Sequence, residues 1–412
     1  MESIREANKR GYQLTKIGLI PKDWNWNYIK YLSTKVTDGE HSTPERCGSG
    51  YYLLSARNIQ DGYISVEDVD FIPENEYLRI IKRCYPEEND ILLSCSGTIG
   101  RVTAVPSNFE CGMVRSAALI KPDHSIIDYK YMMYSLQDCY VQVQILKSLN
   151  QGAQANLFIN HIEKLKICLP PLPEQRAIAH VLSLMDTAIN TNDQLITQKE
   201  LRKKWLMQNL LTGKKRLKGF SDEWNEYHLG DMFSERNERN TNGSTLLSIG
   251  QNGVYPQDES IKKDTSNADK SKYKRICKGD IGYNTMRMWQ GRSALSELEG
   301  IVSPAYTILK PRQNADSLFF SYLFKTPKLI NLFWRNSQGL VDDTLNCKYK
   351  DFSIIKAILP NKAEQIAIAQ VLQAADKEIQ LLKTKTEKLR EQKKGMMQVL
   401  LTGKKRLKVE NN

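Results

Sequence analysis

One segment of the chain occurs twice, and it constrains the fold more than any other feature. Residues 169–218 and 359–408 align without a gap at a constant offset of 190 residues, and 24 of the 50 positions are identical. The run LLTGKKRLK at 210–218 returns unchanged at 400–408. Solenoid repeats recur every ~20–50 residues, so this longer spacing indicates a duplicated half-protein.

Each copy of the repeat is predicted to form one long helix. Pro173 and Glu174 provide helix-start chemistry, since proline suits the first turn and a carboxylate suits the positive end of the helix dipole. No glycine or proline interrupts residues 174–212, and only Gly395 interrupts the second copy. Glycines follow both copies at 213 and 403, where they are typical helix stops. Each helix would contain about 38 residues and extend ~57 Å at 1.5 Å per residue.

Apolar residues in both helices alternate at spacings of four and three, which is typical of a coiled-coil seam. The two seams run from Ile178 to Leu210 and from Ile368 to Leu400. Polar seam residues such as Lys203 either weaken the middle of the seam or set its register. The alternative is that each helix packs only on its own domain, but helices of this length extend beyond a domain of ~140 residues. We therefore expect the two helices to pair antiparallel and to hold two globular units apart.

The globular units read as mixed α/β structure. Runs at 51–54, 90–93, 101–105 and 117–120 predict short strands, and 129–147 predicts a helix. The second unit repeats this order with little identity, and Asp23-Trp24 and Glu223-Trp224 mark the two starts. The predicted fold class is α+β, with two mixed α/β domains joined by two long antiparallel coiled-coil helices in a duplicated, pseudo-twofold architecture.

The expected boundaries follow from these repeats. They are a lead-in at 1–23, a globular unit at 24–168, a helical spacer at 169–218, a second globular unit at 219–358 and a second spacer at 359–412. Residues 404–409 approach the chain end as 214–219 approach the second unit. The lead-in is therefore expected to pack near the C-terminus, which would give a circular arrangement.

Net charge and cysteine content indicate what kind of partner and which cellular compartment to expect. The net charge of +12 and pI near 9.1 suit a polyanionic partner, although the basic runs at 214–216 and 404–406 are equally consistent with solvated helix ends. Eight scattered cysteines without a C-x-x-C pair indicate a reduced, cytoplasmic protein without a zinc site. No apolar run approaches 18 residues, so no membrane segment is expected.

Catalytic motifs are not apparent. The sequence has no G-x-x-x-x-G-K-[ST] phosphate loop. It also lacks the Gly-rich cofactor loop and Asn/Asp-Pro-Pro-aromatic motif that an amino-group methyltransferase needs. Five histidines form no metal-binding pair. We predict no catalytic residue, no metal and no cofactor.

Three polar segments are candidate DNA-reading surfaces: 94–101, 151–156 and 283–292. Arginine reads guanine edges, asparagine and glutamine read adenine, and small residues allow close approach to the DNA backbone. Ordinary solvated hairpin turns are the alternative interpretation. The candidate DNA-binding residues are Ser96, Thr98, Arg101, Arg115, Gln154, Asn156, Asn284, Thr285, Arg287, Gln290 and Arg292.

Over its full length the chain resembles the specificity (S) subunit of type I DNA restriction–modification systems. The resemblance is carried by LPPLPEQRAIAHVL at 169–182, which enters the first spacer, and by LLTGKKRL at 210–217 and 400–407, which leaves each spacer. The second entry departs from this pattern, because Asn361-Lys362-Ala363 replaces Pro-Leu-Pro. Residues 152–156 also look like a family motif, although the counterpart at 339–343 is poorly kept.

The resemblance implies a non-catalytic reader of double-stranded DNA. Each recognition domain would read one half of a bipartite, asymmetric target. The paired helices would set the gap and dock two modification subunits, which carry the adenosyl cofactor, and the complex would recruit ATP-dependent restriction subunits. The helix residues implied to bind these partners are Glu174, Gln175, Ile178, Leu182, Ile189, Glu364, Gln365, Ile368, Leu372 and Ile379.

Three other functions remain open from sequence. A sequence-nonspecific architectural DNA-binding protein would show salt-dependent affinity and little penalty for base changes. A protein-only scaffold would bind partners through the helices and tolerate charge reversal in the loops. An enzyme acting alone would be active as the purified chain.

Overall fold

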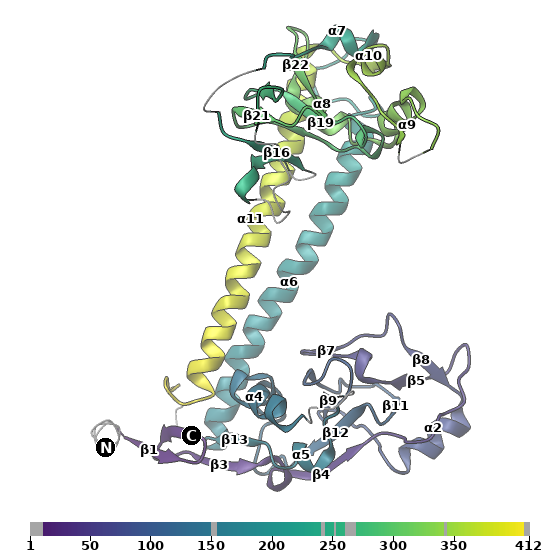
Figure 1. The fold of residues 1–412 in the computed structure, drawn as a ribbon. Coiled ribbons are helices and arrows are strands. Elements are labelled where there is room, and N and C mark those ends of the chain that lie inside the picture. Colours follow the sequence, from purple (N-terminus) through teal and green to yellow (C-terminus); the bar gives the residue numbers. More distant parts are fainter. Residues whose placement is uncertain are drawn as a thin grey trace. The chain divides into compact units, whose positions relative to one another are not determined.

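Two compact units make up the chain, and both contain parts of both long helices. The computed structural model describes residues 11–149, 155–239, 244–250, 253–259, 269–341 and 344–407. The first unit takes in the residues up to Asn192 together with those from Lys385, and the second takes in Asp193–Thr384. Helix α6 (Leu172–Leu210) begins in the first unit and ends in the second, whereas α11 (Lys362–Leu400) does the reverse (Figure 1). Each helix has 39 residues, as the unbroken sequence predicts.

A sheet with the strand order β10-β9-β12-β4 forms the centre of the first globular unit. Its strands are β4 (Ser33–Asp38), β9 (Ile91–Ser94), β10 (Val102–Ala104) and β12 (Ala117–Pro122). A second sheet, β11-β5-β8, contains β5 (Tyr51–Leu54), β8 (Asp70–Ile72) and β11 (Cys111–Met113). Three two-stranded ladders complete it: β1 (Tyr12–Thr15) with β2 (Gly18–Pro21), β3 (Asn25–Tyr28) with β13 (Lys166–Leu169), and β6 (Ile59–Gln60) with β7 (Tyr63–Ile64).

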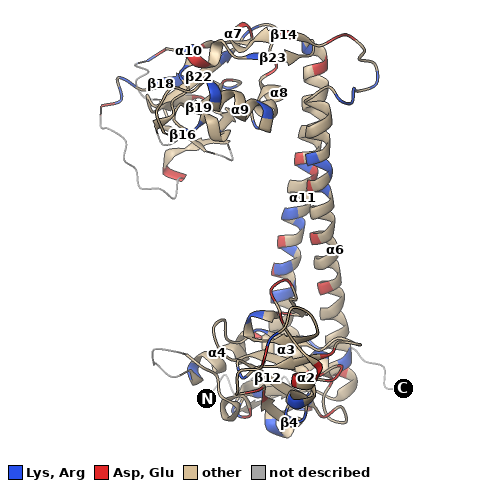
Figure 2. Cartoon of the chain, turned by 90° about the vertical axis from the view of Figure 1, so that its right-hand side faces the viewer, with Lys and Arg blue, Asp and Glu red and all other residues tan. Residues whose placement is uncertain are grey.

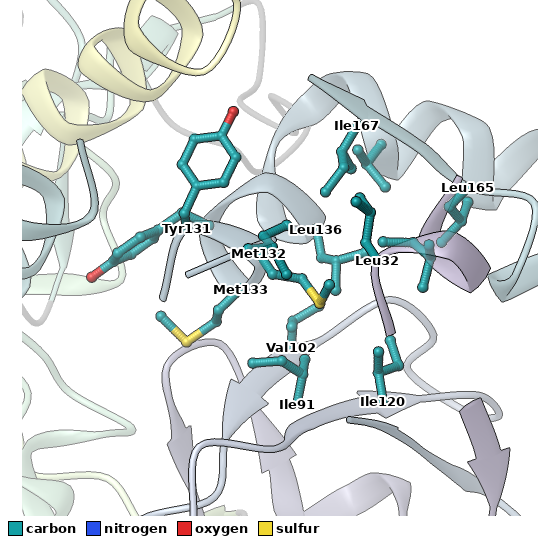
Figure 3. Close-up of a cluster of buried hydrophobic side chains, with 14 of the residues drawn as sticks. Leu32, Ile91, Val102, Ile120, Tyr131, Met132, Met133, Leu136, Leu165 and Ile167 are labelled. Carbon is teal, nitrogen blue, oxygen red and sulfur yellow. The ribbon is translucent and has the colours of Figure 1, made fainter. Parts of the chain in front are cut away.

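Helices cover one face of the central sheet. They are α3 (Tyr129–Gln137), α4 (Cys139–Ser148) and α5 (Ile159–Ile162), whereas α2 (Glu74–Ile81) packs on the second sheet, where Tyr77 and Ile80 share a small core with Leu53 and Ile72. Figure 3 shows Met132 and Leu136 of α3 packed over Ile91, Val102 and Ile120 of the sheet. The same core takes in Ile178 and Leu182 of α6 and Leu400 of α11, so the globular part and the helix ends share one hydrophobic core.

The predicted strands at 51–54, 90–93, 101–105 and 117–120 are confirmed to within one or two residues. The helical stretch predicted for 129–147 is confirmed, but Asp138 divides it into α3 and α4. Asp138 has an extended backbone, and its carboxylate accepts a hydrogen bond from the backbone N–H of Tyr140. Aspartate favours such capping positions over helix interiors.

The second globular unit repeats this plan. Its central sheet has the order β15-β22-β19-β20, from β15 (Phe233–Glu235), β19 (Ile281–Asn284), β20 (Ser293–Leu295) and β22 (Tyr306–Pro311). Ladders pair β14 (Asn225–His228) with β23 (Lys356–Leu359), β16 (Leu247–Gly250) with β17 (Gly253–Pro256), and β18 (Lys274–Ile276) with β21 (Gly300–Val302). The helices are α7 (Leu229–Met232), α8 (Ser317–Leu323), α9 (Pro327–Asn336) and α10 (Tyr349–Ser353).

The internal duplication extends to backbone geometry in the globular parts. Strands β9 and β19 are related by the repeat offset of 190 residues. Before them, Asn89 and Gly279 both have left-handed backbones, with φ of 71° and 89°. A buried aspartate follows in each: Asp90 pairs with Lys121 at 2.6 Å, and Asp280 pairs with Arg236 at 2.7 Å. The same fold therefore underlies two sequences that have diverged.

In each unit a buried glutamate at the start of one long helix accepts hydrogen bonds from a tryptophan and an arginine. In the first unit Glu174 accepts hydrogen bonds from Trp24 Nε1 at 3.0 Å and from Arg406 Nε at 2.6 Å. In the second unit Glu364 accepts from Trp224 Nε1 at 3.1 Å and from Arg216 Nε at 2.6 Å. We call each glutamate, tryptophan and arginine set an interlock. Because the arginine comes from the end of the opposite repeat, the interlock joins the end of one long helix to the beginning of the other.

The described part of the lead-in lies beside the C-terminal residues of the same unit. The Tyr12 hydroxyl donates to the carbonyl of Gly403 at 2.9 Å, and Arg406 donates to both carboxylate oxygens of Asp23 at 2.8 and 2.7 Å. Gly403 has a φ of 69°, and a Cβ at this position would lie 2.5 Å from Pro21. The glycine of the repeated LLTGKKRLK run is therefore required for the helix stop and for this close approach.

Ion pairs within each unit confirm that α6 and α11 run antiparallel. In the first unit Lys393 Nζ lies 2.5 Å from Asp186. In the second unit the pairs are Lys199–Glu378, Lys203–Asp376 and Lys383–Glu200, at 2.5, 2.5 and 2.7 Å. In Figure 2 the ribbons of both helices carry lysine and arginine positions in blue and aspartate and glutamate positions in red.

Candidate nucleic-acid interface

The first candidate loop connects β9 to β10. The two strands pair antiparallel, and Gly97 and Gly100 turn the chain with φ of 66° and 94°. Ser94 organises the loop: its hydroxyl donates to the carbonyl of Thr98 at 2.7 Å and accepts from the backbone N–H of Arg101 at 2.9 Å. Thr98 is exposed, whereas Ser96 and Arg101 are half-buried. The loop therefore has a fixed backbone and presents polar side chains at the carboxyl end of β9.

Two further candidates lie at the same end of β9. Asn156 forms a β-bridge with Ser96, and the next residue, Leu157, donates its N–H to the carbonyl of Cys95 at 2.9 Å. Arg115 is exposed on the turn between β11 and β12, where the carbonyl of Ser116 accepts the N–H of Cys95 at 2.8 Å. The structure thus brings Ser96, Asn156 and the turn carrying Arg115 together. Gln154 lies outside the described residues.

The second candidate loop connects β19 to β20. Thr285 donates its N–H to the carbonyl of Ala305 at 3.3 Å, and Asn284 Oδ1 accepts from the N–H of Met286 at 2.9 Å. Gln290 and Arg292 are exposed, whereas Asn284, Thr285 and Arg287 are half-buried. Buried Met288 holds the middle of the loop in the core. This loop also presents polar groups at the carboxyl end of its strand.

The same backbone hydrogen bond occurs at equivalent positions of the two loops. The N–H of Cys347 donates to the carbonyl of Thr285 at 2.8 Å, as the N–H of Leu157 does to Cys95. Both residues of the pair are shifted by 190 positions. This equivalence identifies Asn346 as the counterpart of Asn156, a residue that the sequence analysis missed although the repeat offset could have located it. Asn346 forms a bridge with Gln338, and its Oδ1 is buried without a hydrogen-bond partner.

Charge is arranged differently at the two ends of each central strand. Buried Asp90 and Asp280 lie at the amino ends of β9 and β19 and are neutralised there by Lys121 and Arg236. Burial raises the pKa of Asp90. The arginines of the candidate loops lie at the carboxyl ends instead. The candidate loops therefore carry their arginines at the end of each strand opposite to the buried ion pair.

The described residues contain no group of three or more histidine, cysteine or acidic side chains placed to hold a metal ion. Burial raises the pKa of Cys95 and Cys111 to about 12, so these thiols are protonated at neutral pH and are not thiolate nucleophiles. No described helix has an apolar stretch sufficient to cross a membrane.

The ten helix residues implied to bind partner subunits are all buried within the chain. Gln175 accepts from the N–H of Asp128 at 2.9 Å and donates to the carbonyl of Pro170 at 2.8 Å. Gln365 makes the matching contacts with Asp316 and Pro360, at 3.0 Å each. The glutamates belong to the interlocks, Ile178, Leu182, Ile368 and Leu372 lie in the two cores, and Ile189 and Ile379 are buried further along the helices. These ten side chains are therefore used in packing within the chain.

Comparison with known families gives this duplicated architecture a name. The type I restriction modification DNA specificity domain matches the chain twice, over residues 22–200 and 221–391. The chain belongs to this family. It is a type I specificity subunit, as the sequence resemblance predicts, and so is the recognition component of an enzyme complex and not its catalytic component.

Curated relatives support this assignment over nearly the whole chain. The putative MjaX specificity subunit of Methanocaldococcus jannaschii is 27% identical, with 99% of both chains covered. The MjaVIII specificity subunit of the same organism is 26% identical, with 94% of each covered. Among solved structures, the type I S subunit from M. genitalium has the same fold, with a TM-score of 0.59 at 18% identity over 92% of this chain and 96% of that one.

Proposed function

We propose that this specificity subunit reads a bipartite, asymmetric target in double-stranded DNA, with one half read by each globular unit. The observation that carries the proposal is the pair of equivalent loops at the carboxyl ends of β9 and β19. The same backbone hydrogen bond occurs at both loops, but the loops differ in the side chains that they present. One fold with two different polar surfaces is what two different half-site sequences require.

The long helices would set the unread gap between the half-sites and dock two modification subunits through their outward faces. The complex would then recruit ATP-dependent restriction subunits and act in the cytoplasm. The antiparallel ion pairs and the two interlocks support the first role, since the ion pairs join the two helices and the interlocks join each globular part to both helix ends.

The direct test is methylome sequencing of cells that express this chain with its modification subunit, compared with cells that express the modification subunit alone. Adenine methylation at one split motif, present only when both chains are expressed, is the expected result. An assembled complex that methylates no motif would favour a protein-only scaffold. Affinity that falls steeply with salt but is indifferent to base changes would favour an architectural DNA-binding protein.

Among the loop residues, Arg287→Ala is expected to weaken or relax recognition of one half-site only. A good arginine contact with a base contributes ~1–3 kcal/mol of discrimination, which corresponds to roughly 5- to 150-fold. Binding assays on duplexes with substitutions in each half would measure the change. Arg275→Ala is the control, because Arg275 is in the same unit but forms ion pairs with Glu238 and Glu299. Equal loss at both halves would contradict the two-reader proposal.

A further inference from the structure

Each unit contains a set of three side chains, here called a clamp, that joins a globular helix to both long helices. In the first clamp the Tyr134 hydroxyl donates to one carboxylate oxygen of Asp186 at 2.7 Å, and Lys393 Nζ donates to the other at 2.5 Å. Lys393 Nζ also lies 5.1 Å from the centre of the Tyr134 ring. Tyr134 belongs to α3, Asp186 to α6 and Lys393 to α11.

The second unit repeats the clamp with different chain segments. The Tyr322 hydroxyl donates to Asp376 at 2.7 Å, and Lys203 Nζ donates to the other carboxylate oxygen at 2.5 Å. Lys203 Nζ lies 5.6 Å from the centre of the Tyr322 ring. The aspartate is now on α11 and the lysine on α6. Both the aspartates and the lysines are related by the offset of 190, although the globular helices α3 and α8 have diverged in sequence.

The clamp is one of two attachment points of the globular helix. Tyr134 lies six residues after Asp128, the aspartate that caps α3, and the N–H of Asp128 is bound by Gln175. From Gln175 to Asp186 is 11 residues, which is about three turns and ~16 Å along α6. Both side chains therefore lie on the same face of that helix. Two attachments separated by this distance fix the orientation of the globular helix as well as its position along α6.

The lysine links the attachment of the globular helix to the register of the two long helices. Lys393 is 18% and Asp186 32% exposed, and in the second clamp Lys203 is 25% and Asp376 40% exposed, so both pairs are partly shielded from water. Lysine in a coiled-coil seam lowers stability unless it is paired, and for that reason it selects one register. Because one carboxylate binds both the lysine and the tyrosine hydroxyl, a shift of either helix would also break the attachment of the globular part.

We propose that the two clamps are positioning devices that make this chain discriminate between DNA targets by the length of the gap between the half-sites. This inference rests on the proposed reading of a bipartite target. One base pair corresponds to ~3.4 Å along the DNA and to about a tenth of a turn around it. A globular part that could slide or rotate by that amount on its helices would accept a gap of the wrong length.

The test uses the chain assembled with its modification subunits and the target found by methylome sequencing. Duplexes carry the native gap, a gap shortened by one base pair or a gap lengthened by one, and initial rates of methyl transfer are measured on each. The variant Tyr134→Phe with Tyr322→Phe removes only the hydroxyls and keeps both lysine–aspartate pairs. We expect the preference for the native gap to fall at least tenfold, while the preference for native over mismatched half-site bases stays within twofold.

Glu200→Gln is the matched control. Glu200 pairs with Lys383 across the same two helices at 2.7 Å, but both side chains are about half exposed. This variant is expected to keep the native gap preference. Unchanged gap preference in the double Phe variant would overturn the proposal, and so would an equal loss of gap and base preference, which indicates general loosening. If the unaltered complex methylates no split target, the proposed function itself fails, and that result is seen before any variant is compared.

Discussion

Replacing residues 224–358 with the corresponding segment of another specificity subunit is expected to change one half of the methylated target completely and to leave the other half unchanged. The segment lies entirely in the second unit, whose core takes its buried residues from 210–372, with none from the first globular part. Its two ends also lie together, because β14 (225–228) pairs with β23 (356–359). Methylome sequencing of cells expressing the exchanged chain measures both halves at once.

The reciprocal exchange of residues 24–168 provides the control. These residues form the first core together with helix residues such as Ile178 and Leu400, so exchange should replace the other half-site and spare the one altered before. A change in both halves after either exchange would mean that the units do not read independently. Methylation that persists at the original full target would mean that another chain carries the specificity.

The long helices could be predicted from sequence because their signals are local. An uninterrupted run with a proline-glutamate start and a glycine stop defined 174–212, and the observed α6 is 172–210. The division between α3 and α4 was not predicted, since the 3.6-residue pattern continues across Asp138 and the capping preference of one aspartate decided the outcome. Contacts between residues far apart in the sequence could not be predicted, because no local pattern near Glu174 indicates that its cationic partner is Arg406.

The recurrence of Glu-Gln at both helix starts was a real signal, but sequence could not tell an inward-facing residue from an outward-facing one. The family resemblance implied a partner-binding role for Glu174 and Gln175, and because polar residues are mostly exposed, nothing in the sequence indicated that they are buried. Both are buried, at 4% and 1% exposure. The candidate DNA residues were located by strand ends and turn composition, which explains why both loops lie at equivalent places while Asn346, in a less recognisable motif, was missed.

Removing the cation of one interlock is expected to have the largest effect on stability. In Arg406→Met the buried carboxylate of Glu174 would keep the Trp24 donor but lose its charged partner. An uncompensated buried charge costs ~3–5 kcal/mol. Arg406 is itself 38% exposed, so water can replace part of the interaction and we expect a loss of about 2 kcal/mol in the free energy of unfolding. Urea denaturation followed by tryptophan fluorescence would measure it.

A second substitution separates the lost charge pair from lost packing. Glu174→Gln in the Arg406→Met background removes the buried charge but keeps an amide oxygen for Trp24 Nε1, so part of the stability should return. Lys356→Met is the surface control, because Lys356 and Glu226 are both more than half exposed, and it should change little. If Arg406→Met unfolds no more easily than Lys356→Met, the interlock does not hold the helix ends together.

Acid titration tests the other contact of Arg406. Hydrogen bonding from Arg406 lowers the pKa of Asp23 below its usual 3.8. A group whose folded-state pKa is depressed stabilises the fold above its unfolded pKa, and this contribution is lost as pH falls through the lower folded value. The stability difference between the wild-type chain and Arg406→Met should therefore be fully present at neutral pH and shrink below about pH 4. A difference that stayed constant down to pH 2 would mean that Arg406 stabilises the fold through Glu174 and through packing on Trp24, whose ring centre lies 5.4 Å from its guanidinium, and not through the carboxylate of Asp23.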